Sequence, residues 1–423
     1  MLSAWATNTF LALRNPNYRI LWAGTTVAFL AFMMSAIVQS VVAFDLTGRN
    51  GAVGFVALGM GVATIVVAPF GGVVADRVSK RKLLLIGQSL IGVNFLAVGV
   101  LIVTGQITIL LLAASTFVLG TVFSFIAPAR QAWIGEIAGP AEIPNAIALQ
   151  QLGMTVTRIG GPFIAAGLIA LPFAGAGGTY LFMGGLFAIV VGTLAQLPPT
   201  RSREKGAGPS IMGDLMLGVG HIRERPRLLL LSLSFIGIVV GGFSYQVILP
   251  GFLENELGRS PDDMGLLLGV GAISGLVATL AVAGISGSKH AWWIMQLGGL
   301  LLGVSLMLTA VAGNLTHALG AMLLVGAGSS VFQLLNNALV MQESDPAFFG
   351  RVMSLTMLAW GLNGLAGLPY GLLADATSER WALGLMGAIV CGVTVVSAAA
   401  YTRVGSRALR TVAVEVEVPI GEP

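Results

Sequence analysis

Twelve runs of about 20 or more mostly apolar residues, the length of an α-helix that crosses a bilayer, follow one another along this chain of 423 residues. Hydrophobic residues make up 56% of the sequence and charged residues only 9%, against roughly 25% in ordinary globular proteins. The runs predict an all-α integral membrane protein with twelve transmembrane helices. The expected spans are 19–45, 51–75, 83–104, 106–128, 143–170, 177–198, 228–253, 262–286, 291–312, 315–340, 352–375 and 380–401.

Lysine and arginine set the expected orientation, because cytoplasmic loops of membrane proteins carry an excess of these residues. With a cytoplasmic N-terminus, 18 of the 22 fall inside and only Arg49, Arg259 and Arg380 fall outside, while Arg158 lies within a helix. The first run is too long for a signal-peptide core, so we expect it to remain as the first helix. Both termini are therefore expected in the cytoplasm, with the chain a multi-pass protein of the plasma membrane.

The longest polar interruption, at 199–227, divides the spans into two sets of six. It begins as a charged link and continues as an amphipathic stretch with apolar residues near helical spacing, which predicts a short helix on the inner membrane surface. The expected organisation is a six-helix bundle over 1–198, a cytoplasmic linker over 199–227, a second six-helix bundle over 228–401, and a cytoplasmic tail over 402–423.

An internal repeat supports two related bundles. Gly48, Arg49, Leu58, Gly59 and Gly61 recur 210 residues later as Gly258, Arg259, Leu268, Gly269 and Gly271. Duplicated halves of a transporter place the substrate site between them near the bilayer midplane. The same displacement puts Ser286 where the first half has Asp76. We therefore expect two pseudo-symmetric bundles whose inner gates differ.

The loop after the second span concentrates charge, with five charged residues among the seven of 76–82. Segment 72–81 reads Gly-Val-Val-Ala-Asp-Arg-Val-Ser-Lys-Arg. It resembles the cytoplasmic signature of the major facilitator superfamily, Gly-x-x-x-Asp-Arg/Lys-x-Gly-Arg/Lys-Arg/Lys, with Ser79 in place of the usual glycine. Segments 15–22, 128–131 and 350–354 resemble the third drug:proton antiporter branch, which includes macrolide-efflux and enterobactin-exporter relatives. The resemblance implies a secondary transporter over nearly the whole chain.

The carboxylate of Asp76 has a physical role independent of that resemblance. At the inner end of helix two it can accept hydrogen bonds from the start of helix eleven, where the helix dipole is positive. Such a contact would close the inner side and break when the bundles rock. The alternative is that the neighbouring bases only fix topology. The expected inner gate comprises Gly72, Asp76, Arg77, Lys80, Arg81 and Arg130.

Helix five carries a second motif, in which Gly160, Gly161, Pro162 and Gly167 follow Arg158. It resembles the Gly-Pro-rich signature associated with exporters, and close helix packing is the alternative reading. A charge at the depth of Arg158 is costly in lipid, so its side chain is expected to face a cavity or polar groups, in a coupling or a structural role.

The resemblance implies a central cavity lined by helices one, four, seven and ten. Neutral polar groups with an apolar wall suit an amphiphilic or weakly charged ligand, although Asn and Gln also join membrane helices. The candidates are Gln39, Phe123, Phe125, Tyr245, Gln246, Gln333, Asn336 and Asn337.

These observations predict an exporter of amphiphilic small molecules such as drugs or siderophores, with proton exchange. The alternatives are an importer or facilitator for a polar metabolite and, ranked lower, a non-transporting membrane sensor. No P-loop and no zinc-ligand spacing occur in the sequence, so we expect no enzyme activity, metal or cofactor. The expected partners are the lipid bilayer, a small-molecule substrate and protons, with no nucleic acid, and we expect a monomer. The single cysteine, Cys391, excludes an intramolecular disulfide.

Overall fold

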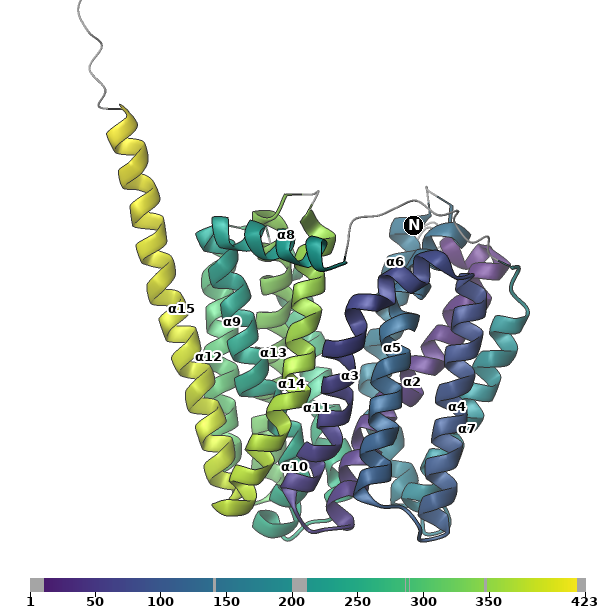
Figure 1. Ribbon diagram of the computed structural model, residues 1–423. Coiled ribbons are helices and arrows are strands. Elements are labelled where there is room, and N and C mark those ends of the chain that lie inside the picture. Colours follow the sequence, from purple (N-terminus) through teal and green to yellow (C-terminus); the bar gives the residue numbers. More distant parts are fainter. Residues whose placement is uncertain are drawn as a thin grey trace, which may run out of the picture.

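All regular elements that the structure describes are helices, as Figure 1 shows. The structure is a computed structural model that describes residues 11–139, 142–199, 211–285, 287–288, 290–345 and 348–416. Helices suit lipid because every backbone N–H and C=O group is satisfied within the segment. The longer helices are α2 (Pro16–Asp45), α3 (Asn50–Arg77), α4 (Lys80–Val103), α5 (Ile109–Ile137), α6 (Ile143–Ile169), α7 (Gly175–Ala195), α8 (Ile211–Glu224), α9 (Pro226–Gly242), α11 (Met264–Val282), α12 (Ala291–Ala310), α13 (Leu315–Glu343), α14 (Phe349–Ala376) and α15 (Glu379–Val416).

Eleven spans within the described residues are long and apolar enough to cross a membrane, which confirms the all-α membrane class. The remaining long helix, α14, has 28 residues, enough to span at 1.5 Å per residue. Asn363, Pro369 and Tyr370 lower its hydropathy, and it packs along α3. Twelve crossings therefore remain a prediction, in which α14 is the twelfth membrane-spanning helix.

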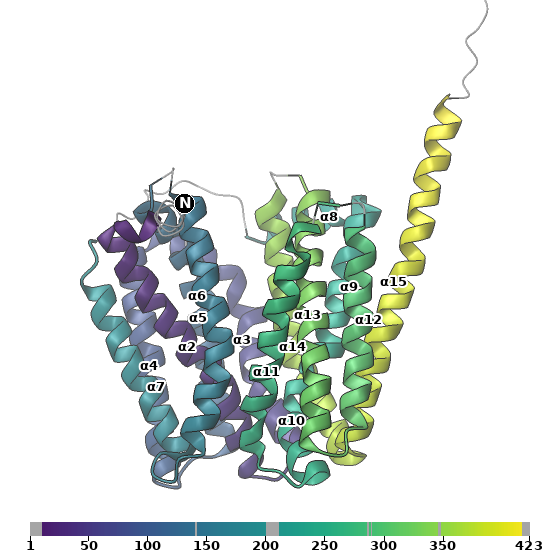
Figure 2. The same ribbon diagram turned by 180° about the vertical axis from the view of Figure 1, so that it is seen from behind.

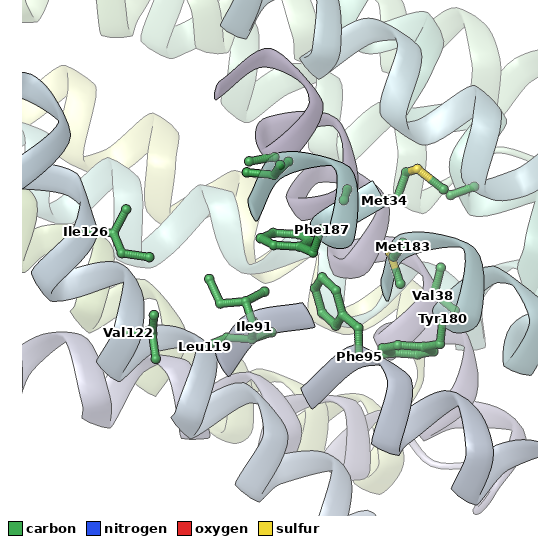
Figure 3. Packing of buried hydrophobic residues seen from close by; sticks show 14 of the residues in the cluster. Met34, Val38, Ile91, Phe95, Leu119, Val122, Ile126, Tyr180, Met183 and Phe187 are labelled. Atoms are coloured by element: carbon green, nitrogen blue, oxygen red, sulfur yellow. The ribbon is translucent and has the colours of Figure 1, made fainter. Parts of the chain in front are cut away.

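The helices gather into two groups, α2–α7 and α9–α15, which stand side by side in Figures 1 and 2. We call the end of the molecule that carries Pro16 and α8 the N face, and the end that carries Asp45 and Gly105 the far face. Buried apolar side chains form two clusters, one mainly in each group. In the first, shown in Figure 3, the ring of Phe95 on α4 meets Tyr180 and Phe187 of α7 edge-on.

Four glycines form left-handed turns at the far face. Gly48, Gly105, Gly175 and Gly258 have φ angles of 63°, 70°, 55° and 61°. A residue with a Cβ adopts such angles only at a cost, so glycine is favoured at these turns. Gly48 and Gly258 are the repeated pair, and their shared conformation shows that the two halves turn alike at this point.

The helices that follow this repeated turn do not keep the same register. Gly59 of α3 packs against α5 in its own group, whereas Gly269 of α11 packs against Phe163 of α6 in the other group. The short 3₁₀ helix η4 (Pro261–Asp263) precedes α11 and has no counterpart before α3. Positions 210 residues apart in α3 and α11 therefore face different neighbours.

Span seven is broken rather than continuous, in contrast to the single run expected at 228–253. After α9 come a 3₁₀ segment, η2 (Phe243–Val247), a short α10 (Leu249–Gly251) and a π-helical turn, η3 (Phe252–Glu256). Glycines 241 and 242 and Pro250 flank or lie in this break. Irregular backbone at membrane depth is tolerated where it is enclosed by protein or lines a cavity.

Two helical segments lie outside the membrane-spanning part of the molecule on the N-face side. The amphipathic stretch of the linker forms α8, which runs across the N face in Figure 1. The last helix, α15, continues beyond its membrane-spanning part to Val416, so the expected tail begins as helix. The charged link at 200–210 lies outside the described residues.

Candidate functional site

A cavity of about 310 Å³ lies between the two groups of helices. Its walls come from α2, α6, η2, α11 and α13, which makes the break in span seven part of the site. The cavity extends toward the N face, because Gln151 near the start of α6 and Thr279 near the end of α11 both line it. Most lining groups are neutral: amides, hydroxyls and aliphatic side chains. Such a mixture binds a ligand with both apolar and polar parts.

Arg158 is the one charged side chain among the described residues that line this cavity. It lies deep in the protein but is accessible from the cavity. Tyr245 lines the same cavity, and no carboxylate is found among its described lining residues. Since no ion pair to Arg158 occurs among the described residues, the cavity supplies the polar surroundings that a guanidinium needs at membrane depth.

The expected cavity residues divide between the wall and the surrounding core. Tyr245, Gln246, Gln333 and Asn337 line the cavity, together with Arg158 and Pro162. Gln39, Phe123, Phe125 and Asn336 do not belong to its lining. The ring of Phe123 stacks on Phe32, with 5.1 Å between ring centres, and the side-chain amide of Asn336 is fully buried with no hydrogen-bond partner among the described residues. The expectation restricted to helices one, four, seven and ten missed the wall from α11 and, apart from Arg158, the wall from α6.

The glycines of the helix-five motif differ in their surroundings. A Cβ on Gly161 would lie 2.6 Å from the Cβ of Met33, so this glycine permits close approach of α6 and α2. Pro162 lies where α6 meets α11, since a Cβ on Gly265 would lie 2.5 Å from its carbonyl oxygen. Packing does not require glycine at positions 160 and 167, because a Cβ added at either position would have no neighbouring atom closer than 4.0 Å.

The two groups are joined at the far face through the start of α3. Asp375, at the end of α14, accepts hydrogen bonds from the backbone N–H of Asn50 at 2.7 Å and of Gly51 at 2.9 Å. Arg49, the residue before α3, supplies no side-chain cap, so Asp375 caps the helix from the other group. The amide of Asn50 also donates to Glu379 at 2.9 Å. We call Asn50, Gly51, Asp375 and Glu379 the far-face latch.

At the N face, each described ion pair joins residues of the same group, and none links the two groups. Lys80 pairs with Glu136 at 2.5 Å, and Arg81 donates to the carbonyl of Ala195 at 2.6 Å, all within α4–α7. In the other group, Arg225 pairs with Asp345 at 2.7 Å. Figure 1 shows that the N-face ends of the two groups stand apart, whereas their far-face ends meet.

The expected inner gate is described only in part. Arg130 is buried, and its guanidinium lies 5.0 Å from the ring centre of Phe29. The backbones of Gly72, Asp76 and Arg77 lie in the last turns of α3, and the side chains of Asp76 and Arg77 lie outside the described part of the structure. Lys80 and Arg81 contribute to contacts within their own bundle.

Comparison with known families gives one match along most of the chain. Residues 21–368 match the family model described as Major Facilitator Superfamily. The matched region includes α2 through most of α14, and with them every residue that lines the cavity.

Curated relatives are distant but collinear with this chain. An uncharacterised MFS-type transporter, YfiS of Bacillus subtilis (strain 168), is 25% identical over 408 residues, 92% of each chain. Multidrug resistance protein 1 of the same organism is 23% identical over 64% of this chain and 66% of its own. The staphyloferrin A transporter of Staphylococcus aureus (strain NCTC 8325 / PS 47) is 22% identical over 79% of this chain and 84% of its own.

Solved structures share the fold. The nucleoside transporter NupG superposes with a TM-score of 0.74 at 13% identity, over 91% of this chain and 99% of its own. At that identity the likeness speaks for the arrangement of helices alone.

Proposed function

Because the chain belongs to the Major Facilitator Superfamily, a family of transporters rather than enzymes, we propose that it is a secondary active transporter that exports amphiphilic small molecules by alternating access. The observation that carries the proposal is the cavity between the two groups, which extends toward the N face while the latch closes the far face. A site of this kind, exposed to each side in turn, moves a ligand across the membrane as the halves rock.

The proposed membrane topology follows the distribution of lysine and arginine, which are in excess in cytoplasmic loops. We place the N face in the cytoplasm, with twelve crossings, two moving bundles over 1–198 and 228–401, and 199–227 as their link. The cavity then takes its ligand from the cytoplasm in the conformation described above. Export is favoured by the helix-five motif and by the likeness to a protein named for multidrug resistance. We assign the chain to the drug:proton antiporter branch on the same grounds.

Flux in inverted membrane vesicles tests direction and coupling. We expect an imposed interior-acid pH gradient to drive accumulation of the fluorescent amphiphiles dansylglycine and dansylglycinamide, followed by dansyl fluorescence inside the vesicles. Vesicles without the chain serve as the control. Accumulation that requires the opposite gradient would favour the importer, and equilibration that ignores the gradient would favour a facilitator.

The inner gate yields a separate prediction for Asp76→Asn. A carboxylate at a helix N-terminus contributes about 0.3–1 kcal/mol, and up to about 2 kcal/mol when partly buried. Losing it should favour the N-face-open conformation, reduce flux several-fold and leave expression unchanged. The measurement is thiol labelling of cysteines placed at the N-face ends of α3 and α14, compared with dansylglycinamide flux.

Asp345→Asn provides the matched control for that variant. Asp345 is also a carboxylate at the N face, but its ion pair with Arg225 stays within one group. Equal labelling and equal flux in Asp76→Asn and the unaltered protein would refute the gate and leave the charged loop as a topology signal.

A further inference from the structure

The charge of the cavity defines a class of substrate. Of its described lining residues, Arg158 carries a full positive charge, and none is Asp or Glu. On the proposed function above, we propose that this transporter selects anionic amphiphiles, with a carboxylate or similar anionic group held at Arg158 and an apolar body against the aliphatic wall.

The polar groups of the cavity support an anion rather than a cation. Gln246, Gln333 and Asn337 offer amide N–H donors, and Tyr245 offers a hydroxyl. Donors of this kind complete the hydrogen bonding of a carboxylate whose charge is balanced by a guanidinium. A cationic group in the same place would meet Arg158 without a carboxylate to offset the repulsion. In a site of reduced dielectric such repulsion is much stronger than in water.

Aliphatic parts of the cavity wall accommodate the rest of the ligand. Met33 and Ile37 of α2, Leu268 and Leu276 of α11, and Leu334 of α13 present aliphatic side chains to the same space. Water can solvate Arg158 while the cavity is empty. When an apolar body displaces that water, the ligand must provide the counter-charge, because the described lining contains no carboxylate. The cavity therefore binds the anion and the apolar body together.

Three probes with one fluorophore separate charge from shape. Dansylglycine is anionic, dansylglycinamide is neutral, and dansylethylenediamine carries a primary amine that is cationic when protonated. Binding is measured by fluorescence with the full chain in phosphatidylcholine nanodiscs, and flux by counterflow in proteoliposomes. We expect dansylglycine to bind at least tenfold more tightly than dansylglycinamide, and the cation most weakly.

Variants at Arg158 test whether that residue sets the preference. In Arg158→Gln we expect the affinity for dansylglycine to fall at least tenfold to that of dansylglycinamide, whose own affinity changes little. Arg158→Lys should retain part of the preference, which a purely structural role would not predict. Arg19→Gln, the same change at an exposed arginine near the start of α2, should leave all three affinities unchanged.

The outcomes separate the charge inference from the transport proposal. A cation that binds as tightly as the anion, or a preference that survives in Arg158→Gln, overturns the inference even if counterflow persists. The expected charge preference without counterflow of any probe supports the inference and overturns the proposed transport. Absence of binding by all three probes overturns the assignment of the cavity as the substrate site.

Discussion

Replacing Gly326 with leucine is expected to destabilise the packing of α11 against α13, two helices that line the cavity. A Cβ at this position of α13 would overlap the carbonyl group of Gly271 on α11, so no rotamer of a larger side chain relieves the contact. The same crossing is fixed by the Ser274 hydroxyl, which donates to the carbonyl of Leu323 at 2.7 Å. Separating the helices would break this hydrogen bond within the membrane, where water cannot replace it.

The expected cost is about 3 kcal/mol or more, the upper end of overpacking penalties, against a total stability of roughly 5–15 kcal/mol for ordinary proteins. The readouts are the monodisperse yield on size-exclusion chromatography and the thermal unfolding midpoint in nanodiscs. Gly320→Leu is the matched control, because Gly320 lies on the same helix with nothing within 4 Å of its Cβ position. Equal yields and midpoints for the two variants would contradict the crossing described here.

Sequence predicted the helices well because lipid leaves few alternatives. Apolar length and its polar boundaries placed the first span at 19–45 and the fifth at 143–170, close to α2 (Pro16–Asp45) and α6 (Ile143–Ile169). The break in span seven was missed, because hydropathy counts apolar side chains and does not distinguish regular helix from 3₁₀ or π turns. Gly241, Gly242 and Pro250 were the signal that could have indicated it.

The site was predicted less fully because it depends on which side of each helix meets the other group. Asn336 and Asn337 are neighbours in sequence, yet Asn337 lines the cavity while Asn336 is buried in the bundle. Successive side chains of a helix point about 100° apart. Composition alone does not tell which side of the helix faces the other group. Arg158 was predicted to face a cavity or polar groups because a charge is costly in lipid, a physical constraint that requires no knowledge of packing, and the structure places it in the cavity wall.

The far-face latch was missed because its partners are 325 residues apart. One signal was present. Gly371-Leu-Leu-Ala-Asp375 at the end of α14 repeats the Gly-Val-Val-Ala-Asp pattern at the end of α3. The two helices pack against each other and run antiparallel, so α14 ends near the start of α3. A carboxylate at the end of one can then cap the start of its partner.

Asp375→Asn is therefore expected to favour opening of the far face. The asparagine oxygen can still accept one N–H of Asn50 or Gly51, but its amide nitrogen is a donor and cannot accept the other. Hydrogen bonds to charged groups contribute about 1.5–3 kcal/mol, and the exposure of Asp375 favours the lower figure. A loss of about 1.5 kcal/mol changes the conformational equilibrium roughly tenfold.

Distances between spin labels measure that shift. With Cys391 replaced by alanine, labels at Gln106 and Gly313 report the far face, and labels at Gln196 and His290 report the N face. We expect Asp375→Asn to lengthen the first distance and shorten the second. Asp263→Asn is the control, because this far-face carboxylate pairs with Arg259 at 2.8 Å within its own group.

The direction in which each variant shifts the conformational equilibrium tests whether the two carboxylates act on opposite faces. Asp76→Asn removes a contact proposed to hold the N face closed, so it should favour the N-face-open form, whereas Asp375→Asn removes one that holds the far face closed. If both carboxylates act as latches on opposite faces, the double variant should return toward the balance of the unaltered protein. Its exchange between conformations should be faster, because both closed forms lose a contact that must break before the halves rock. Two shifts in the same direction would show that the carboxylates do not act on opposing gates.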